Sequence, residues 1–264
     1  MSRPDMGVSA PAHEPEEAAR MSAFERLIGT LLSPGETFQD INRKPNWLVP
    51  ILLAIVFSLA GNLIIFKRIK PDWEKIAREQ VEKSLESQGK TMSDLPEQQR
   101  EAINNRIKMS SKISPIITIA GPFFLPIVMA ILALLFWGVT TIMGEQTTYK
   151  KVFSLTAHAF SVVLIIVQTL LGVLVVFLRN PEDIDITKGI ATTNPGMLMP
   201  QGTSPILTSL FTRLDILSIW FLVLMSIGLA AVCRKMKVGK AAAIVFGLWT
   251  LYIIGAVAFA AILR

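Results

Sequence analysis

Residues 116–143 read IITIAGPFFLPIVMAILALLFWGVTTIM, a run of 28 residues without a charged side chain. A helix needs about 20 apolar residues to cross the roughly 30 Å hydrocarbon core of a bilayer. This run is therefore long enough to span a membrane, and four other stretches of the chain resemble it in length and composition. We predict an all-α, polytopic membrane protein whose five transmembrane helices cover residues 47–66, 116–143, 152–178, 210–233 and 241–263.

The amino-acid composition is typical of an integral membrane protein. The chain is 52% hydrophobic and 17% charged, whereas a soluble domain carries about 25% charged residues. The net charge of +6 is explained by Lys and Arg beside the membrane spans. Because neither a zinc-ligand spacing nor a basic recognition helix is present, we expect the lipid bilayer as a partner and no nucleic acid.

The chain offers little that would support catalysis. It contains one cysteine, Cys233, and two histidines, too few for a disulfide or for most metal sites. The fingerprints of nucleotide, zinc-hydrolase, redox and serine-hydrolase sites are all missing from the sequence. We therefore predict no catalytic residue, no metal and no cofactor, and expect that the protein is not an enzyme.

The N-terminal region divides into two parts. Residues 1–21 are rich in Pro, Glu and small side chains, a composition that cannot bury a core, and we predict a disordered cytoplasmic tail. Residues 22–46 are predicted to form amphipathic, interfacial helices. A long first apolar run that lies far from residue 1 also argues against a cleavable signal peptide.

The first interfacial helix has one apolar face, which Arg26 and Thr30 do not join. Such a helix suits the lipid headgroup region, although it could equally pack against the membrane bundle. A second helix is predicted to start at Ser33, with Glu36 completing a capping box, and to turn two side chains toward apolar surroundings. The residues of the first apolar face are Phe24, Leu27, Ile28, Leu31 and Leu32, and the two of the second helix are Phe38 and Ile41.

Residues 47–264 form the predicted membrane domain, which contains two long inserts. The insert at 67–115 is polar, and its i,i+4 pairs of opposite charge predict a helical hairpin outside the bilayer. The insert at 179–209 contains four prolines and two glycine-containing turns that oppose a regular helix through most of its length.

The short loops predict how the chain is threaded through the membrane. Arg234, Lys235, Lys237 and Lys240 lie between the last two spans, and Lys150 and Lys151 follow the second. Cytoplasmic loops carry an excess of Lys and Arg, so we predict a cytoplasmic N-terminus and an exterior C-terminus. Three bases at residues 67–70 oppose this orientation because they would lie outside.

Several polar residues fall within or beside the predicted spans, where such groups are expensive and often functional. From the rise of 1.5 Å per residue, Asn62, Arg213 and Asp215 share a depth and are predicted to form a polar cluster beneath the exterior surface. His158 lies at another depth, so a His158–Asp215 catalytic or proton-relay pair is not expected. Interhelical hydrogen bonds and a ligand or ion site both remain open for the cluster. The other candidate functional polar residues are His158, Gln168 and Glu145.

Three parts of the chain resemble bacterial Yip1-domain proteins. The first comprises LSPGETF at residues 32–38 and KPNWLVP at 44–50, and the second TYKKVF at 148–153 with Ala157, His158 and Ala159. The third is DILSIW at 215–220, followed by Ile227 and Gly228. The likeness covers about residues 24–264 without the two long inserts. The chain departs from the family at residues 161–163, where Ser-Val-Val replaces a stretch that often contains proline.

The resemblance implies a five-span helical bundle with a cytoplasmic N-terminus. Eukaryotic relatives take part in vesicle trafficking and associate with small GTPases of the Rab type, a role that does not transfer to bacteria. We expect a multi-span protein of a bacterial inner membrane that organises partner proteins or lipids through residues 22–42 and 67–115. The alternative is a small transporter, channel or lipid-moving protein that uses the polar residues within the bundle.

Overall fold

A computed structural model describes residues 20–86, 88–184, 186, 189–200 and 203–262. Within these ranges the chain is helical, and none of them contains a strand, so the predicted all-α class is confirmed. Nearly all of the predicted disordered tail, residues 1–21, lies outside the described residues.

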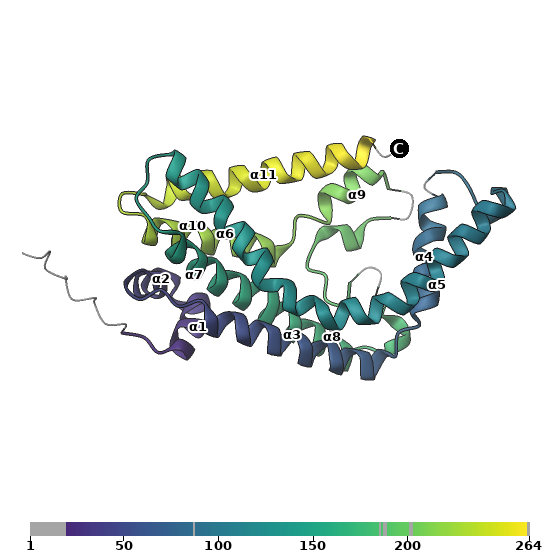
Figure 1. The fold of residues 1–264 in the computed structure, drawn as a ribbon, viewed down its shortest axis with the longest axis horizontal. Coiled ribbons are helices and arrows are strands. Elements are labelled where there is room, and N and C mark those ends of the chain that lie inside the picture. The colour runs from purple at the N-terminus through teal and green to yellow at the C-terminus, as the bar shows by residue number, and fades with distance from the viewer. Residues whose placement is uncertain (1–19, 87, 185, 187–188, 201–202, 263–264) are drawn as a thin grey trace, which may run out of the picture.

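The long helices lie side by side along one axis of the molecule (Figure 1). Two of them are composite: one continues through a 3₁₀ turn and the other through a π-helical segment. The shorter helices of the described part are α1 and α2, which precede the bundle, and α4 and α9. The elements are α1 (Ala23–Leu32), α2 (Pro34–Arg43), α3 (Leu48–Ile69), α4 (Trp73–Glu86), α5 (Glu97–Ala120), η2 (Gly121–Phe124), α6 (Leu125–Ile142), α7 (Tyr149–Ala159), η3 (Phe160–Val167), α8 (Gln168–Leu178), α9 (Pro205–Phe211), α10 (Ile216–Val232) and α11 (Val238–Ile262), with 3₁₀ turns at Met92–Asp94, Pro181–Asp183 and Pro195–Leu198.

Four helical segments are long and apolar enough to cross a membrane. They are Leu48–Ile69, Glu97–Ile142, Tyr149–Leu178 and Val238–Phe259. α10 is also apolar but has 17 residues, fewer than the roughly 20 that a full crossing takes. The polytopic helical fold is therefore supported, whereas the predicted count of five spans is not confirmed by helix length.

Two predicted boundaries were wrong. The span predicted at 210–233 begins only at Ile216, because the Asp215 carboxylate caps α10 by accepting from the Leu217 N–H at 3.2 Å. A capping aspartate starts a helix at the next residue. The second helix of the hairpin does not stop where the predicted insert ends, at residue 115, but continues to Ala120, and the chain tightens to 3₁₀ geometry at Gly121–Phe124.

The predicted capping box at Ser33 and Glu36 was also wrong. Ser33 precedes α2 but makes no side-chain cap hydrogen bond, and α2 begins on Pro34, whose fixed φ suits a first helical turn. The capping box lies one helix earlier. There the Ser22 N–H donates to Glu25 Oε2 at 2.7 Å, and the Glu25 N–H donates to Ser22 Oγ at 3.3 Å.

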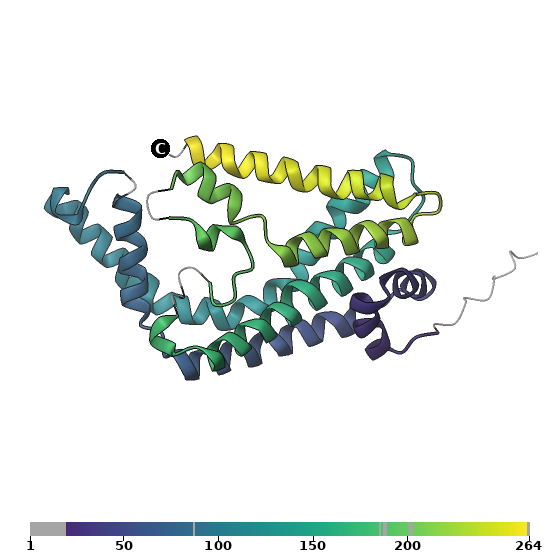
Figure 2. The same cartoon turned by 180° about the vertical axis from the view of Figure 1, so that it is seen from behind.

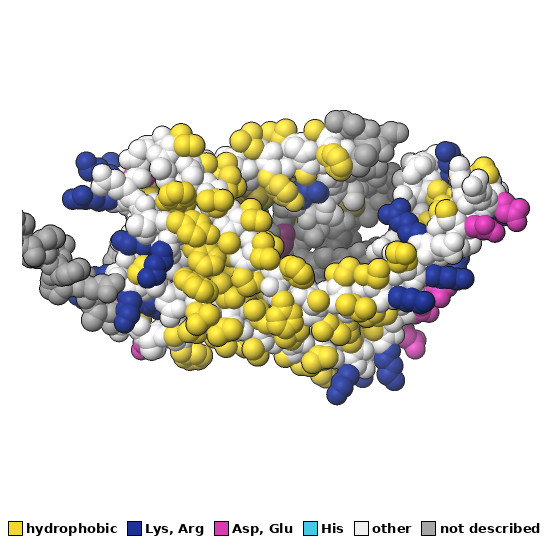
Figure 3. All heavy atoms as spheres, in the orientation of Figure 1, with side chains coloured by type: hydrophobic (Ala, Val, Ile, Leu, Met, Phe, Trp, Pro, Cys, Tyr) yellow, Lys and Arg dark blue, Asp and Glu magenta, His cyan; other side chains and the backbone are white. Residues whose placement is uncertain are grey.

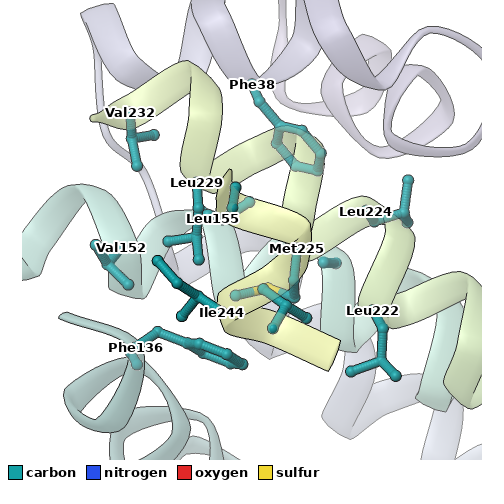
Figure 4. Close-up of a cluster of buried hydrophobic side chains, with 14 of the residues drawn as sticks. Phe38, Phe136, Val152, Leu155, Leu222, Leu224, Met225, Leu229, Val232 and Ile244 are labelled. Atoms are coloured by element: carbon teal, nitrogen blue, oxygen red, sulfur yellow. The ribbon is translucent and has the colours of Figure 1, made fainter. Parts of the chain in front are cut away.

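The main core joins α2, α6, α7, α10 and α11 (Figure 4). Leu155 of α7 lies against Gly228 of α10 so closely that a Cβ at Gly228 would overlap its side chain. Small residues permit this kind of close helix approach in membrane bundles. The buried side chains labelled in Figure 4 are Phe38, Phe136, Val152, Leu155, Leu222, Leu224, Met225, Leu229, Val232 and Ile244.

The two ends of the bundle carry different elements. α1 and α2 lie at one end, together with the α6–α7 and α10–α11 connections, and the α4–α5 hairpin lies at the other (Figure 1, Figure 2). Lys and Arg gather toward both ends, while hydrophobic side chains cover the surface between them (Figure 3). This distribution is typical of a protein whose middle faces lipid and whose ends face water.

Candidate functional site

The α1–α2 hairpin is docked on the bundle rather than attached loosely to it. α1 packs against α2, α7 and η3, and α2 packs against α10 and α7. Phe38 and Ile41 of α2 are fully buried, which confirms their predicted apolar surroundings. The hairpin therefore belongs to the folded body of the protein.

A buried ion pair joins the two helices of this hairpin. Arg26 Nη2 lies 2.8 Å from Asp40 Oδ2, and both side chains are less than 5% exposed. Arg26 Nε donates to the same carboxylate at 2.9 Å, while Nη1 donates to the Lys44 carbonyl at 2.9 Å. The guanidinium thus links the carboxylate of α2 to the end of that helix. A fork of donors that matches a carboxylate in this way is a strong, directional contact.

The Asp40 carboxylate is stabilised in its charged form. Burial alone would raise its pKa, but hydrogen bonds from the Arg20 N–H, the Arg26 side chain and the Met21 N–H, together with the Arg26 charge, hold the pKa below its usual value. The Arg20 N–H donates at 2.8 Å and the Met21 N–H at 3.3 Å. Asp40 therefore also fastens the segment that leads into α1.

The docking of α1 splits its predicted apolar face, because Leu27 is buried and Leu31 packs against the main core. Arg26 and Thr30 are buried, whereas Phe24, Ile28 and Leu32 are 69%, 45% and 79% exposed. Spacings of four residues place the three exposed side chains along one stripe of the helix. We name Phe24, Ile28 and Leu32 the α1 ridge. The predicted packing of α1 against the bundle is therefore confirmed for one side of the helix, while the α1 ridge points outward.

His158 lies on α7, close to this docked hairpin. Its ring is 1% exposed, and Nδ1 is 2.8 Å from the Ser154 carbonyl. Ser154 and Ser161 precede and follow it at helical spacings of four and three residues, so all three share one face. Both serine hydroxyls are buried and have no hydrogen-bond partner among the residues that the structure describes. The π-helical segment begins two residues after His158.

The structure gives Asn62, Arg213 and Asp215 separate partners. Asn62 Nδ2 donates to the Thr118 carbonyl at 2.9 Å, which ties α3 to α5. Arg213 Nη1 donates to the Ser209 carbonyl at 2.9 Å, and its guanidinium carbon lies 5.8 Å from the centre of the Tyr252 ring. The Asp215 carboxylate accepts from the Thr193 hydroxyl. Among the described residues, the three side chains share no hydrogen bond or ion pair.

The two remaining candidates also have definite partners. Gln168 Nε2 donates to the Ala191 carbonyl at 2.8 Å and so holds the 179–209 insert against α8. Glu145 was considered among the polar residues of the spans, but it follows α6 in the short connection to α7. There its carboxylate lies 2.7 Å from Lys240 Nζ of α11. Each of these interactions joins two segments of the fold.

The chemistry available at these places is limited. Within the described ranges, no group of three or more His, Cys, Asp or Glu side chains could hold a metal ion. Cys233 is a free, buried thiol. The most elaborate polar arrangement is the docked hairpin, and sequence reasoning missed its two central residues. Arg26 and Asp40 are 14 residues apart and lie on different helices, so their pairing leaves no periodic pattern in the sequence. The one available signal was the spacing of four residues between Arg26 and Thr30, which places both on one face of α1.

The fold and the surface define a class: a multi-span helical membrane protein with two short helices docked at one end of the bundle and a helical hairpin at the other. Comparison with known proteins gives the family. A Yip1 domain matches residues 28–259, and the chain belongs to the Yip1 family. "Membrane protein YknW" of Bacillus subtilis (strain 168) is 26% identical over 204 residues, which cover 77% of this chain and 76% of that protein. No solved structure matches the chain.

Proposed function

We propose that this protein is a non-enzymatic scaffold of a bacterial inner membrane, which organises partner proteins or lipids through the α1–α2 hairpin and the α4–α5 hairpin. The observation that carries the proposal is the α1 ridge. A helix that buries its arginine and exposes Phe24, Ile28 and Leu32 has a surface suited to the membrane interface or to an apolar partner.

The proposed scaffold crosses the membrane five times, with a cytoplasmic N-terminus. α10 serves as the fourth span in this arrangement, because it runs antiparallel beside α11 and shares the main core with α6 and α7. The bases of the α10–α11 connection, and Lys150 and Lys151 at the start of α7, then face the cytoplasm, as the positive-inside rule favours. Trp47 and Tyr149, whose rings both contact Phe153, lie at the height where interfacial aromatic residues gather.

Labelling of intact cells tests the topology. With Cys233 replaced by Ala, we expect a membrane-impermeant maleimide to label Ser93→Cys in the hairpin from outside and to label Lys237→Cys only after the membrane is opened. Equal labelling of both positions in intact cells would contradict the proposed threading.

In-cell photo-crosslinking tests the scaffold role. A photoreactive side chain at Ile28 of the α1 ridge or at Gln99 of the hairpin is expected to capture one defined protein or lipid class. The control position is Leu251, which is exposed on α11 and faces the bulk lipid in the proposed arrangement. If Ile28 and Gln99 give the same products as Leu251, the organising role is wrong.

One observation favours the alternative, a transporter, channel or lipid-moving protein. Within the described part of the chain, the buried hydroxyls of Ser154 in α7 and Ser161 in η3 have no hydrogen-bond partner and lie close in sequence to His158, and polar side chains of this kind mark pathways in many membrane proteins. Reconstituted flux and lipid-scrambling assays that compare the wild type with His158→Ala and Asp215→Asn distinguish the two functions. Transport that either substitution abolishes would replace the scaffold proposal.

A further inference from the structure

A basic cleft of about 220 Å³ opens between the two short connections of the bundle, α6–α7 and α10–α11. We propose that this cleft binds the phosphate group of an anionic lipid headgroup. The proposal rests on the proposed threading, which places both connections at the cytoplasmic surface. The cleft is lined by Gly144, Glu145, Gln146, Arg234 and Lys235.

The cleft is built from loops that are fixed to each other. The Arg234 N–H donates to the Gln146 carbonyl at 3.3 Å, and Arg234 Nη1 lies 3.5 Å from Gln146 Oε1. Cys233 and Met236, on either side of the two basic residues, are 4% and 5% exposed. These anchors hold the connection while Arg234 and Lys235 face solvent, so little order has to be created when a ligand binds.

The charge of the cleft favours an anion although Glu145 lines it. The Glu145 side chain is 7% exposed and its carboxylate lies 2.7 Å from Lys240 Nζ, which offsets its charge locally. The two remaining charged groups of the lining are the cations Arg234 and Lys235. A guanidinium beside an ammonium is a common arrangement for phosphate because both donate hydrogen bonds to its oxygens.

The surroundings of the cleft indicate a lipid rather than a free phosphate. Ile142 and Met143, at the end of α6, are 87% and 44% exposed, and Val238, at the start of α11, is 52% exposed. Exposed apolar side chains therefore lie beside the cleft on both connections. A phospholipid presents this same sequence of groups, acyl chains followed by a phosphate, at the membrane surface.

Lipid retention by the full-length protein tests the proposal. The protein is titrated with phosphatidylglycerol and with phosphatidylcholine in detergent, and bound lipid is counted by native mass spectrometry. Because a base near the membrane surface is worth about 1 kcal/mol, or roughly fivefold in affinity, we expect Arg234→Gln with Lys235→Gln to weaken phosphatidylglycerol binding about thirtyfold. Phosphatidylcholine binding should change less than twofold.

The matched control removes the same charge from the same end of the bundle but outside the cleft. Lys44→Gln with Lys237→Gln should retain phosphatidylglycerol within about threefold of the wild type, because neither lysine lines the cleft. Equal losses in the two double variants would mean diffuse attraction and overturn the site, and so would the absence of any loss. Displacement of the lipid by an equal concentration of inorganic phosphate would overturn the assignment to a lipid.

The Glu145→Gln variant is the control for misfolding, because it is expected to bind more lipid and not less. Removing this carboxylate frees Lys240 and leaves only cations in the lining, so phosphatidylglycerol should bind more tightly, which misfolding does not produce. Unchanged or weaker binding in a folded Glu145→Gln protein contradicts the proposal. The crosslinking test of the α1 ridge has a separate readout, so the cleft and the scaffold role can fail independently.

Discussion

The end of the bundle that carries α1 and α2 is packed like a globular core, whereas the end that carries the α4–α5 hairpin is not. One continuous helix shows the difference: seven of the eleven residues of α7 are buried, against two of the eleven in α8. Burial decreases along α11 in the same way. Ala241, Ile244 and Val245 are buried near its start, and Ile253 is the last buried side chain among its described residues.

The two ends are also held by different interactions. The packed end has a filled apolar core and the buried Arg26–Asp40 pair. At the open end α3 packs on α8, and single side-chain hydrogen bonds to backbone carbonyls add to this contact, from Asn62 to Thr118 and from Gln168 to Ala191. This contrast predicts that substitutions at the packed end have the larger effects on stability.

The largest effect is expected when one member of the buried ion pair is removed. Asp40→Leu leaves the Arg26 guanidinium buried without its counter-charge, and breaking such a pair costs about 3–5 kcal/mol. We expect α1 and α2 to leave the bundle, so that hydrogen exchange of their amides rises by orders of magnitude. Arg26→Met combined with Asp40→Leu should recover much of the protection, because neither buried charge remains. If the double variant is as unprotected as Asp40→Leu, the loss has another cause.

The same pair predicts a dependence on pH. The pKa of Asp40 is lowered by folding, so its contribution to stability is complete above the unfolded pKa of about 3.9 and is lost as the pH falls through the folded pKa. Docking of the hairpin should therefore weaken below about pH 4. Asp40→Asn should abolish that part of the pH dependence, as measured by hydrogen exchange between pH 3 and 6.

A smaller loss is expected where α7 and α10 touch. Gly228→Ala places a Cβ against the Leu155 side chain, and overpacking of this kind costs about 1–3 kcal/mol. The midpoint of thermal unfolding in detergent, followed by tryptophan fluorescence, should fall. Gly247→Ala is the control, because nothing lies within 4 Å of the added Cβ. Equal midpoints for the two variants would show that α7 and α10 do not approach so closely in solution.

At the open end, Asn62→Leu should be mild. It removes one hydrogen bond between α3 and α5, and such bonds in membranes average about 0.6 kcal/mol and reach about 1.7 kcal/mol. We expect a small fall in the unfolding midpoint, less than that of Gly228→Ala. A fall larger than that of Gly228→Ala would reverse the comparison between the two ends.

The smallest effect is expected for Lys240→Gln. The Lys240 side chain is 41% exposed, and solvent-exposed ion pairs are worth about 0–1 kcal/mol. The unfolding midpoint should therefore stay near that of the wild type. A marked loss of stability would mean that Glu145, which is nearly buried, depends on Lys240 more than an exposed partner normally allows.

Local patterns were sufficient to predict much of this architecture. The apolar runs predicted the long helices, and the spacing of Phe38 and Ile41 predicted that they face apolar groups, because both depend on neighbours in sequence. The start of α10 was misplaced because apolar composition continues through residues 210–214, while the helix begins at the cap that Asp215 provides.

The polar side chains were less predictable. Depth along a helix axis can be counted from the sequence, but rotation about the axis and the identity of the neighbouring helix cannot. Asn62 and Asp215 were placed at one level, yet Asn62 faces α5 and Asp215 caps its own helix and meets Thr193. Glu145 was grouped with residues of the spans, and only the fold showed its partner, 95 residues later in the chain.

The sequence by itself determined that this chain is a helical membrane protein, because the free energy of placing long apolar runs in lipid depends only on their length and composition. The tertiary structure decided which side of α1 is buried. That side contains Arg26, because Asp40 of α2 pairs with this arginine inside the fold. The tertiary structure likewise decided that the two short connections meet in one cleft, because that depends on the order in which the helices pack.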